Sequence, residues 1–122
     1  MHLGNFSVSL SVKDLQKSLK FYQTLGFEQV SGDIAENWLV LQNGSARIGL
    51  FQDIIDENLL TFNPKWNENK QTTADMEDVR EIAQKMTTAG FSPEESSLDG
   101  EGPAYFYLKD PDGNKLLFDQ YV

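Results

Sequence analysis

The sequence contains no cysteine and only one histidine, His2. The lack of cysteine excludes disulfides, thiolate zinc sites and cysteine nucleophiles, and it suits a reducing compartment. Without a second histidine, a Ser-His-Asp arrangement would depend on His2 at the N-terminal end, where fraying is common. We therefore assign no catalytic residue.

Long hydrophobic runs and positive charge are also scarce. No stretch approaches the ~20 apolar residues of a membrane span, and no basic segment leads into an apolar run at the N-terminus. The chain has 10 Lys and Arg against 19 Asp and Glu, a formal charge of −9 that would repel a nucleic-acid backbone. We expect a cytoplasmic protein that binds neither membranes nor nucleic acid.

What the sequence does contain is an internal repeat. Asp14 lies twelve residues before Gly26-Phe27, and 64 positions further along Asp78 lies twelve residues before Gly90-Phe91. Both intervals show the periodicity of an amphipathic helix, with Asp as the N-terminal cap and Gly at the C-terminal end. A duplicated supersecondary unit explains this pattern, and small ligands usually bind in a cleft between two such units.

Strand patterns accompany both predicted helices. Phe6–Val12 alternates apolar residues with serines, and Asn43-Gly44 is a strong hairpin signal of the type I′ turn. The 64-residue offset places the first strand of the second copy at Gln71–Met76, although that segment is weakly apolar. The remaining expected strands are Trp38–Gln42, Arg47–Gln52, Tyr105–Leu108 and Lys115–Asp119.

These patterns predict an α+β fold of two β-α-β-β-β modules in a single domain, 1–122. Module one covers about residues 5–52, a connecting segment covers 53–69, and module two covers about 70–122. The connecting segment is too apolar for a solvated linker. We expect it to cover the cleft, to contact a second subunit, or to pack over the core of its own chain.

Several short motifs make the chain resemble the vicinal oxygen chelate superfamily. They are Val12-Lys13-Asp14-Leu15 through Ser18, Phe21-Tyr22, Leu25-Gly26-Phe27 and Asp110-Pro111-Asp112-Gly113-Asn114. That superfamily includes glyoxalase-type lyases, extradiol dioxygenases, fosfomycin-modifying enzymes and bleomycin-binding resistance proteins. The resemblance implies curved mixed sheets around a concave cleft, helices on the outer face, and a homodimer.

The resemblance also implies where a divalent metal would bind in the family's enzymes. Its ligand positions, usually His and Glu, fall on Ser7 and Gly49 in module one and on Gln71 and Leu117 in module two. Divalent cations such as Mg²⁺ or Zn²⁺ need imidazole or carboxylate donors. We therefore expect no metal and no other cofactor.

The residues expected to face the cleft are suited to binding rather than to catalysis. Arg47 either holds a ligand carboxylate bidentately or pairs with a surface acid. The candidate ligand-binding residues are Ser7, Ser9, Trp38, Arg47, Gly49, Gln71, Thr73, Tyr105, Tyr107 and Leu117.

These residues indicate a metal-free protein that binds a small organic molecule in the intermodule cleft, similar to bleomycin-resistance-type binding proteins. The first alternative is a glyoxalase-like lyase or isomerase, or a dioxygenase, with an atypical metal site. The second is an interaction or regulatory subunit.

Overall fold

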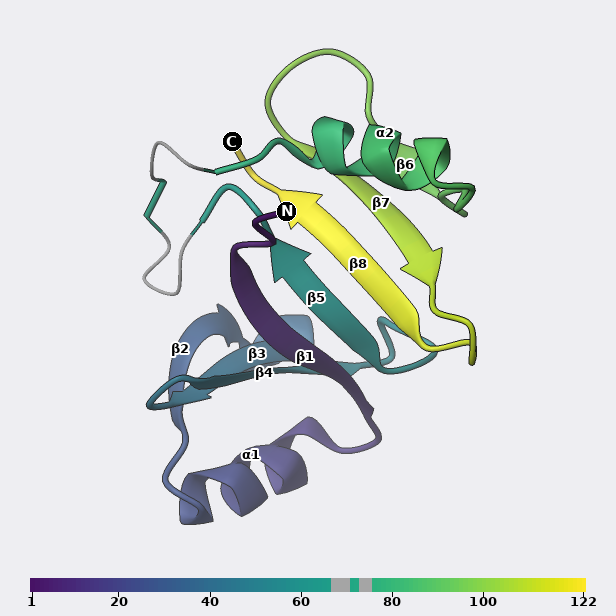
Figure 1. Ribbon diagram of the computed structural model, residues 1–122. Helices are drawn as coiled ribbons and strands as arrows, with labels where there is room; N and C mark the ends of the chain where they lie inside the picture. The colour runs from purple at the N-terminus through teal and green to yellow at the C-terminus, as the bar shows by residue number, and fades with distance from the viewer. Residues whose placement is uncertain (67–70, 73–75) are drawn as a thin grey trace. The chain divides into compact units, whose positions relative to one another are not determined.

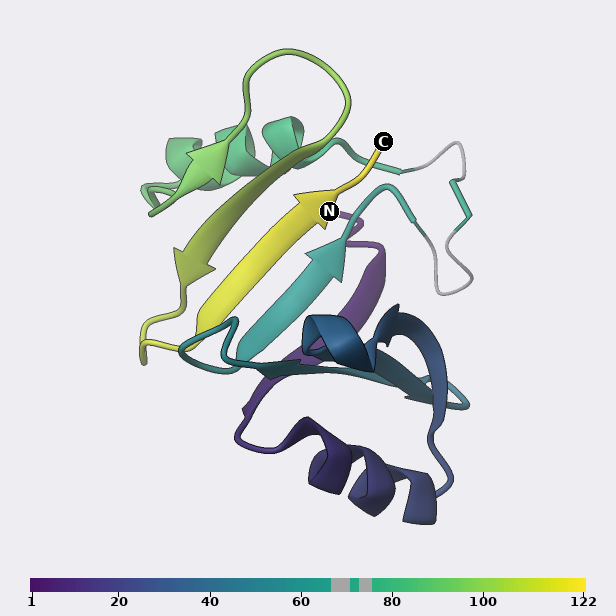
Figure 2. The same ribbon diagram turned by 180° about the vertical axis from the view of Figure 1, so that it is seen from behind.

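The structure is a computed structural model that describes residues 1–66, 71–72 and 76–122. It divides into two compact units: the first unit is Ser7–Leu59, and the second unit is Met1–Phe6 with Leu60–Val122. Each unit packs one α-helix against β-strands, which confirms the predicted α+β class (Figures 1 and 2). No helix in the described ranges has the length and apolar character to span a membrane.

The first unit has the strand order β2-β3-β4-β1. β1 runs parallel to β4, and the other neighbouring strands are antiparallel. Its elements are β1 (Asn5–Val12, whose first two residues belong to the second unit), α1 (Leu15–Thr24), β2 (Glu28–Asp33), the 3-10 helix η1 (Ile34–Glu36), β3 (Trp38–Asn43) and β4 (Ala46–Gln52).

Helix α1 begins and ends as the sequence predicts. The Asp14 carboxylate accepts a hydrogen bond from the Lys17 N–H at 3.1 Å, and Gly26 has a φ of 97° just after the helix. The helix lies on one side of the strands (Figure 1). The core between them consists of Leu15, Leu39, Leu41 and Leu50, with Leu19 and Tyr22 of the predicted helical stripe packed against it.

The hairpin between β3 and β4 forms where expected, but its turn type differs. Asn43 pairs with Ala46, so the central turn residues are Gly44 and Ser45. Only Gly44 has a positive φ, at 57°. A type I′ turn needs positive φ at both central positions, so that prediction is wrong.

The second unit has the strand order β5-β8-β7-β6, with β7 antiparallel to both of its neighbours. Helix α2 packs on this sheet, and the core includes Val79, Ile82, Phe106 and Phe118. The elements are β5 (Leu59–Asn63, whose first residue belongs to the first unit), α2 (Val79–Thr88), β6 (Ser96–Ser97), β7 (Ala104–Lys109) and β8 (Lys115–Gln120).

The first strand of the second copy is not where the 64-residue offset places it. Gln71, Thr72 and Met76 belong to no strand, and residues 73–75 lie outside the described part of the chain. The strand beside β8 is instead β5, Leu59–Asn63, which lies within the predicted connecting segment 53–69. The apolar residues of that segment are therefore partly strand residues.

The start of the connecting segment is attached to its own chain. The Asn58 side-chain oxygen accepts a hydrogen bond from the Ser11 N–H, and the Ser11 hydroxyl donates to the Ile55 carbonyl, both at 2.9 Å. These bonds hold residues 55–58 against the end of β1. They support packing over its own chain for this part of the segment.

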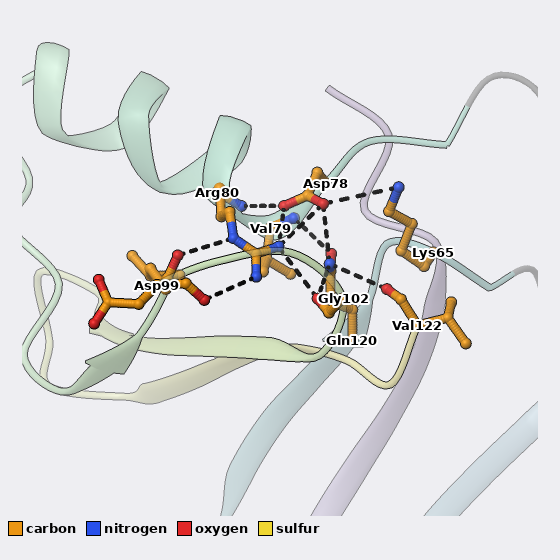
Figure 3. A network of polar contacts seen from close by, with 9 residues as sticks. Lys65, Asp78, Val79, Arg80, Asp99, Gly102, Gln120 and Val122 are labelled. Atoms are coloured by element: carbon orange, nitrogen blue, oxygen red, sulfur yellow. Dashed lines mark hydrogen bonds and ion pairs between the residues drawn. The ribbon is translucent and has the colours of Figure 1, made fainter.

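A polar network fastens the start of α2 to β8 (Figure 3). Gln120, only 1 % exposed, accepts a hydrogen bond from the Val79 N–H at 2.8 Å and donates to Asp78 and to the Gly102 carbonyl. Arg80 donates to both carboxylate oxygens of Asp78 and to the carbonyls of Leu98, Asp99 and Gly102. The network thereby joins the helix, the loop before β7 and the last strand.

This network predicts a pH-dependent stability through Asp78. Burial of the carboxyl raises its pKa, but hydrogen bonds from Gln120 and Arg80 outweigh this effect, so the pKa lies below its usual value. A depressed pKa stabilises the fold above the unfolded-state pKa, and this contribution is lost as the pH falls through the folded-state pKa. We therefore expect stability to fall on acidification below about pH 4.

The Asp78→Asn variant isolates this effect because Asn still caps a helix. Urea unfolding of the native chain and the variant over a pH series should show a smaller loss of stability at acidic pH in the variant. Equal losses in both proteins would contradict the assignment to Asp78.

Candidate functional site

Five candidate residues of the first unit lie on strand positions that point away from α1. Leu10, Leu39 and Leu50 face the helix. Since side chains alternate along a strand, the odd-numbered residues of β1 and β4 and the even-numbered residues of β3 take the opposite face. This helix-free face carries Ser7, Ser9, Trp38, Arg47 and Gly49.

Gly49 lies at the centre of this face, where it pairs with Ser9 on β1 and with Val40 on β3. A Cβ atom placed on Gly49 would lie 2.6 Å from Cε2 of Phe51, so the Phe51 ring covers this position. The same ring stacks on Trp38, with centroids 6.3 Å apart and planes 7° apart. The glycine leaves room for an aromatic pair.

Arg47 has a partner within the first unit. Its Nε and Nη2 donate to the side-chain oxygen of Gln42 at 3.3 and 2.7 Å, and the two residues are cross-strand neighbours. This contact orients the guanidinium on the helix-free face. Binding of a ligand carboxylate by Arg47 stays a prediction.

The second unit has a helix-free face of its own. Phe106 and Phe118 pack toward α2, so Tyr105, Tyr107 and Leu117 point away from it. Tyr107 pairs with Leu117, and the two tyrosine rings make an edge contact with centroids 5.9 Å apart. The structure thus brings three of the predicted site residues together on this face.

Asp119 lies on the same face, opposite Tyr105 in the strand register. Burial raises the pKa of its carboxyl, and hydrogen bonds from the Tyr121 hydroxyl and the Gln120 backbone partly oppose this. Burial and the neighbouring carboxylate raise the pKa of Tyr121 to about 12, although 58 % of that residue is exposed. Burial and the nearby Glu95 and Asp119 also raise the pKa of Tyr107.

The remaining two candidates are not placed on a strand. Gln71 is exposed and belongs to no strand or helix, and Thr73 lies outside the described residues. The pairing of Gln71 and Thr73 with the serines of β1 through the repeat therefore has no support from the described part of the chain.

The residues at the implied metal positions do not fit a divalent cation. Ser7 and Gln71 offer weak neutral donors, Leu117 offers none, and the Phe51 ring covers Gly49. Within residues 1–66, 71–72 and 76–122, no three His, Cys, Asp or Glu side chains are grouped so that they could hold a metal ion.

The site residues predicted from the sequence include neither Phe51 nor Asp119. The signal for both was strand parity: Phe51 follows Gly49 by two residues, and Asp119 follows Leu117 by two. A hollow in the first unit was not predicted from the sequence. It has a volume of about 310 Å³ and lies beside the start of α1, lined by Lys13, Asp14, Leu15, Gln16, Ile34, Asn37 and Gln52.

Comparisons with known proteins cover nearly the whole chain. The family described as the Glyoxalase/Bleomycin resistance protein/Dioxygenase superfamily matches residues 4–118. Virulence protein STM3117 of Salmonella typhimurium is 28 % identical over 123 residues, which cover 93 % of this chain and 81 % of that protein.

Solved structures share the fold. A glyoxalase/bleomycin resistance protein/dioxygenase superfamily member from Vibrio splendidus 12B01 aligns with 94 % of this chain and 97 % of its own, at 17 % identity and a TM-score of 0.66. The Mn(II)-bound glyoxalase from Novosphingobium aromaticivorans aligns with 99 % of this chain and 40 % of its own, at 19 % identity and a TM-score of 0.61.

Proposed function

Because the chain belongs to the Glyoxalase/Bleomycin resistance protein/Dioxygenase superfamily, we propose that it binds a small organic molecule without a resident divalent metal. In this proposal it resembles the bleomycin-resistance-type binding proteins of the superfamily. The observation that carries the proposal is the chemistry at the implied metal positions, where Ser7, Gly49, Gln71 and Leu117 provide no imidazole or carboxylate.

The helix-free faces supply the groups that such binding needs. Small-molecule sites are mostly apolar and aromatic, with a few polar groups that fix the ligand's orientation. In the first unit, the Trp38 and Phe51 rings share the helix-free face with Ser9 and Arg47. In the second unit, Tyr105 and Tyr107 supply the aromatic surface. The cleft predicted from the repeat stays a prediction.

The alternative is a lyase, isomerase or dioxygenase with an atypical metal site. Asp119 favours it, since a carboxyl whose pKa burial has raised is suited to proton transfer. One carboxylate without further strong donors is a poor metal site. We therefore rank binding above turnover.

Metal analysis separates the two functions. We expect freshly purified protein to contain less than stoichiometric Ni, Zn, Mn, Fe or Mg, and added metal ions to leave the melting temperature unchanged. EDTA-treated protein serves as the control and should melt at the same temperature. One equivalent of retained metal whose removal lowers the melting temperature would favour the enzyme.

A thermal-shift screen of small organic cations, anions and neutral aromatic compounds then tests binding itself. A ligand at 100 times its Kd should add about 2.7 kcal/mol to the free energy of unfolding. If no compound class raises the melting temperature, the binding proposal fails.

We further propose that the protein acts as a homodimer, as the resemblance implies, and that it works in the cytoplasm, a reducing compartment that suits its lack of cysteine. The excess of acidic residues, with a formal charge of −9, supports a protein that does not bind nucleic acid or anionic membranes.

A further inference from the structure

The helix-free face of the second unit combines aromatic rings with a single half-buried carboxylate. Tyr105 lies opposite Asp119 in the register of β7 and β8, and its ring meets the edge of the Tyr107 ring. Tyr105 is 39 % exposed, so part of its surface is open to a ligand.

This face already places a cation over an aromatic ring. The Lys115 ammonium lies 4.6 Å from the centroid of the Tyr107 ring. Such contacts are favourable because the face of an aromatic ring carries partial negative charge. The Tyr105 ring is the neighbour of the Tyr107 ring on β7, and it lies opposite Asp119 of β8.

Asp119 itself has no cationic partner among the described residues. None of the ion pairs found there includes it, and its side-chain partner is the neutral hydroxyl of Tyr121. A half-buried carboxylate without a counter-charge has a desolvation cost that a bound cation would offset. Charge complementarity therefore points to a positively charged ligand.

A second hydrogen-bond acceptor lies at the same end of the sheet as Asp119. Asn63 is 7 % exposed, and its side-chain oxygen has no hydrogen-bond partner within the described ranges. Phe62 packs on Phe118 on the α2 side, so Asn63 takes the helix-free side. Figures 1 and 2 show the neighbouring strands β5 and β8 running in the same direction. Asn63 and Asp119 therefore both lie near the C-terminal ends of their strands, at the same end of the sheet.

We propose that this face binds an organic ammonium ion, with Asp119 supplying the charge, Tyr105 the aromatic surface and Asn63 a hydrogen-bond acceptor. The inference rests on the proposed small-molecule function and specifies its ligand class. A primary or secondary amine fits best, because its N–H groups use both acceptors.

Three probes with the same ring and different charges test the proposal: benzylamine as its ammonium ion, benzyl alcohol and benzoate. Titration calorimetry on the full chain at neutral pH measures each Kd. We expect benzylammonium to bind about tenfold more tightly than benzyl alcohol, and benzoate to bind least.

The Asp119→Asn variant removes the charge but keeps an acceptor for the Tyr121 hydroxyl. We expect it to bind benzylammonium and benzyl alcohol equally, with little change for the alcohol. Glu101→Gln is the matched control, since it changes the net charge by the same amount at an exposed loop position. It should retain the full preference for the cation, and melting curves verify that both variants fold.

Other outcomes overturn the cation assignment in distinguishable ways. Equal Kd values for the three probes in the native protein, or an unchanged preference in Asp119→Asn, would sustain small-molecule binding and reject Asp119 as its determinant. Tighter binding of benzoate that Arg47→Met abolishes would place the recognised charge on the ligand's carboxylate instead. If benzylamine does not bind, the ammonium class is rejected, whereas the broader ligand screen decides the proposed function.

Discussion

The Gln120→Leu variant is expected to lose about 3 kcal/mol or more of unfolding free energy, because one buried side chain satisfies several polar groups. Gln120 is 1 % exposed, accepts a hydrogen bond from the Val79 N–H and donates to the Gly102 and Val122 carbonyls and to Asp78 (Figure 3). Leucine fills similar space but leaves the buried Val79 N–H without its acceptor. It also removes one donor each from Asp78 and from the Gly102 carbonyl, which then depend on Arg80. Urea unfolding followed by circular dichroism measures the loss.

The first unit provides the matched control for this variant. The side-chain oxygen of Gln52 accepts a hydrogen bond from the Leu15 N–H at 2.8 Å, just as Gln120 does for Val79. Gln52 is only partly buried. We expect Gln52→Leu to lose about 1 kcal/mol. Equal losses in the two variants would mean that the additional bonds of Gln120 contribute nothing to stability.

The Phe106→Ala variant is expected to lose about 3–5 kcal/mol, the cost of a large cavity in a packed core. Phe106 is completely buried, and its ring stacks on Phe118 with centroids 4.7 Å apart and planes 7° apart. Phe118 in turn stacks on Phe62, so the cavity would disrupt contacts across β7, β8 and β5. Chemical unfolding at constant pH measures the change in the midpoint.

Phe91→Ala serves as its control. Phe91 lies just after α2 and is 53 % exposed, so its truncation should change stability by no more than about 0.5 kcal/mol. A loss of several kcal/mol in this variant, or of less than about 1 kcal/mol in Phe106→Ala, would contradict the packing described for the second unit.

Local patterns predicted most of the fold. The apolar periodicity and the Asp and Gly end signals placed both helices correctly, and alternation placed β3, β4, β7 and β8 to within one residue at each end. These signals work because helix periodicity and strand alternation are properties of short segments. Three strands were not placed: β2 and β6 received no residue range, and β5 was assigned to the connecting segment. The residues of β5, Leu59-Leu60-Thr61-Phe62-Asn63, have strand composition, but the constant offset of the repeat favoured Gln71–Met76.

The candidate site was predicted less completely because it depends on register and on which face the helix covers. Alternation of side chains along a strand was enough to group Ser7 with Ser9 and Arg47 with Gly49. It did not determine on which face of the sheet Trp38 lies, because only the packing of Leu39 and Leu41 on α1 shows which side of β3 is helix-free. The two-residue spacing places Phe51 on the same face as Gly49, but the contact in which its ring covers Gly49 depends on the three-dimensional structure.

The shifted position of β5 changes how the two helices are attached to their sheets. Two residues, Lys13 and Asp14, separate β1 from α1, whereas fifteen residues separate Asn63 from Val79. A short connection holds its helix near the sheet by chain connectivity. A longer connection has a larger entropic cost of loop closure, which side-chain hydrogen bonds must offset. Lengthening the Lys13-Asp14 connection should therefore disturb α1 more than an equal insertion before α2 disturbs α2. The second unit is the one that can accept new sequence between a strand and its helix.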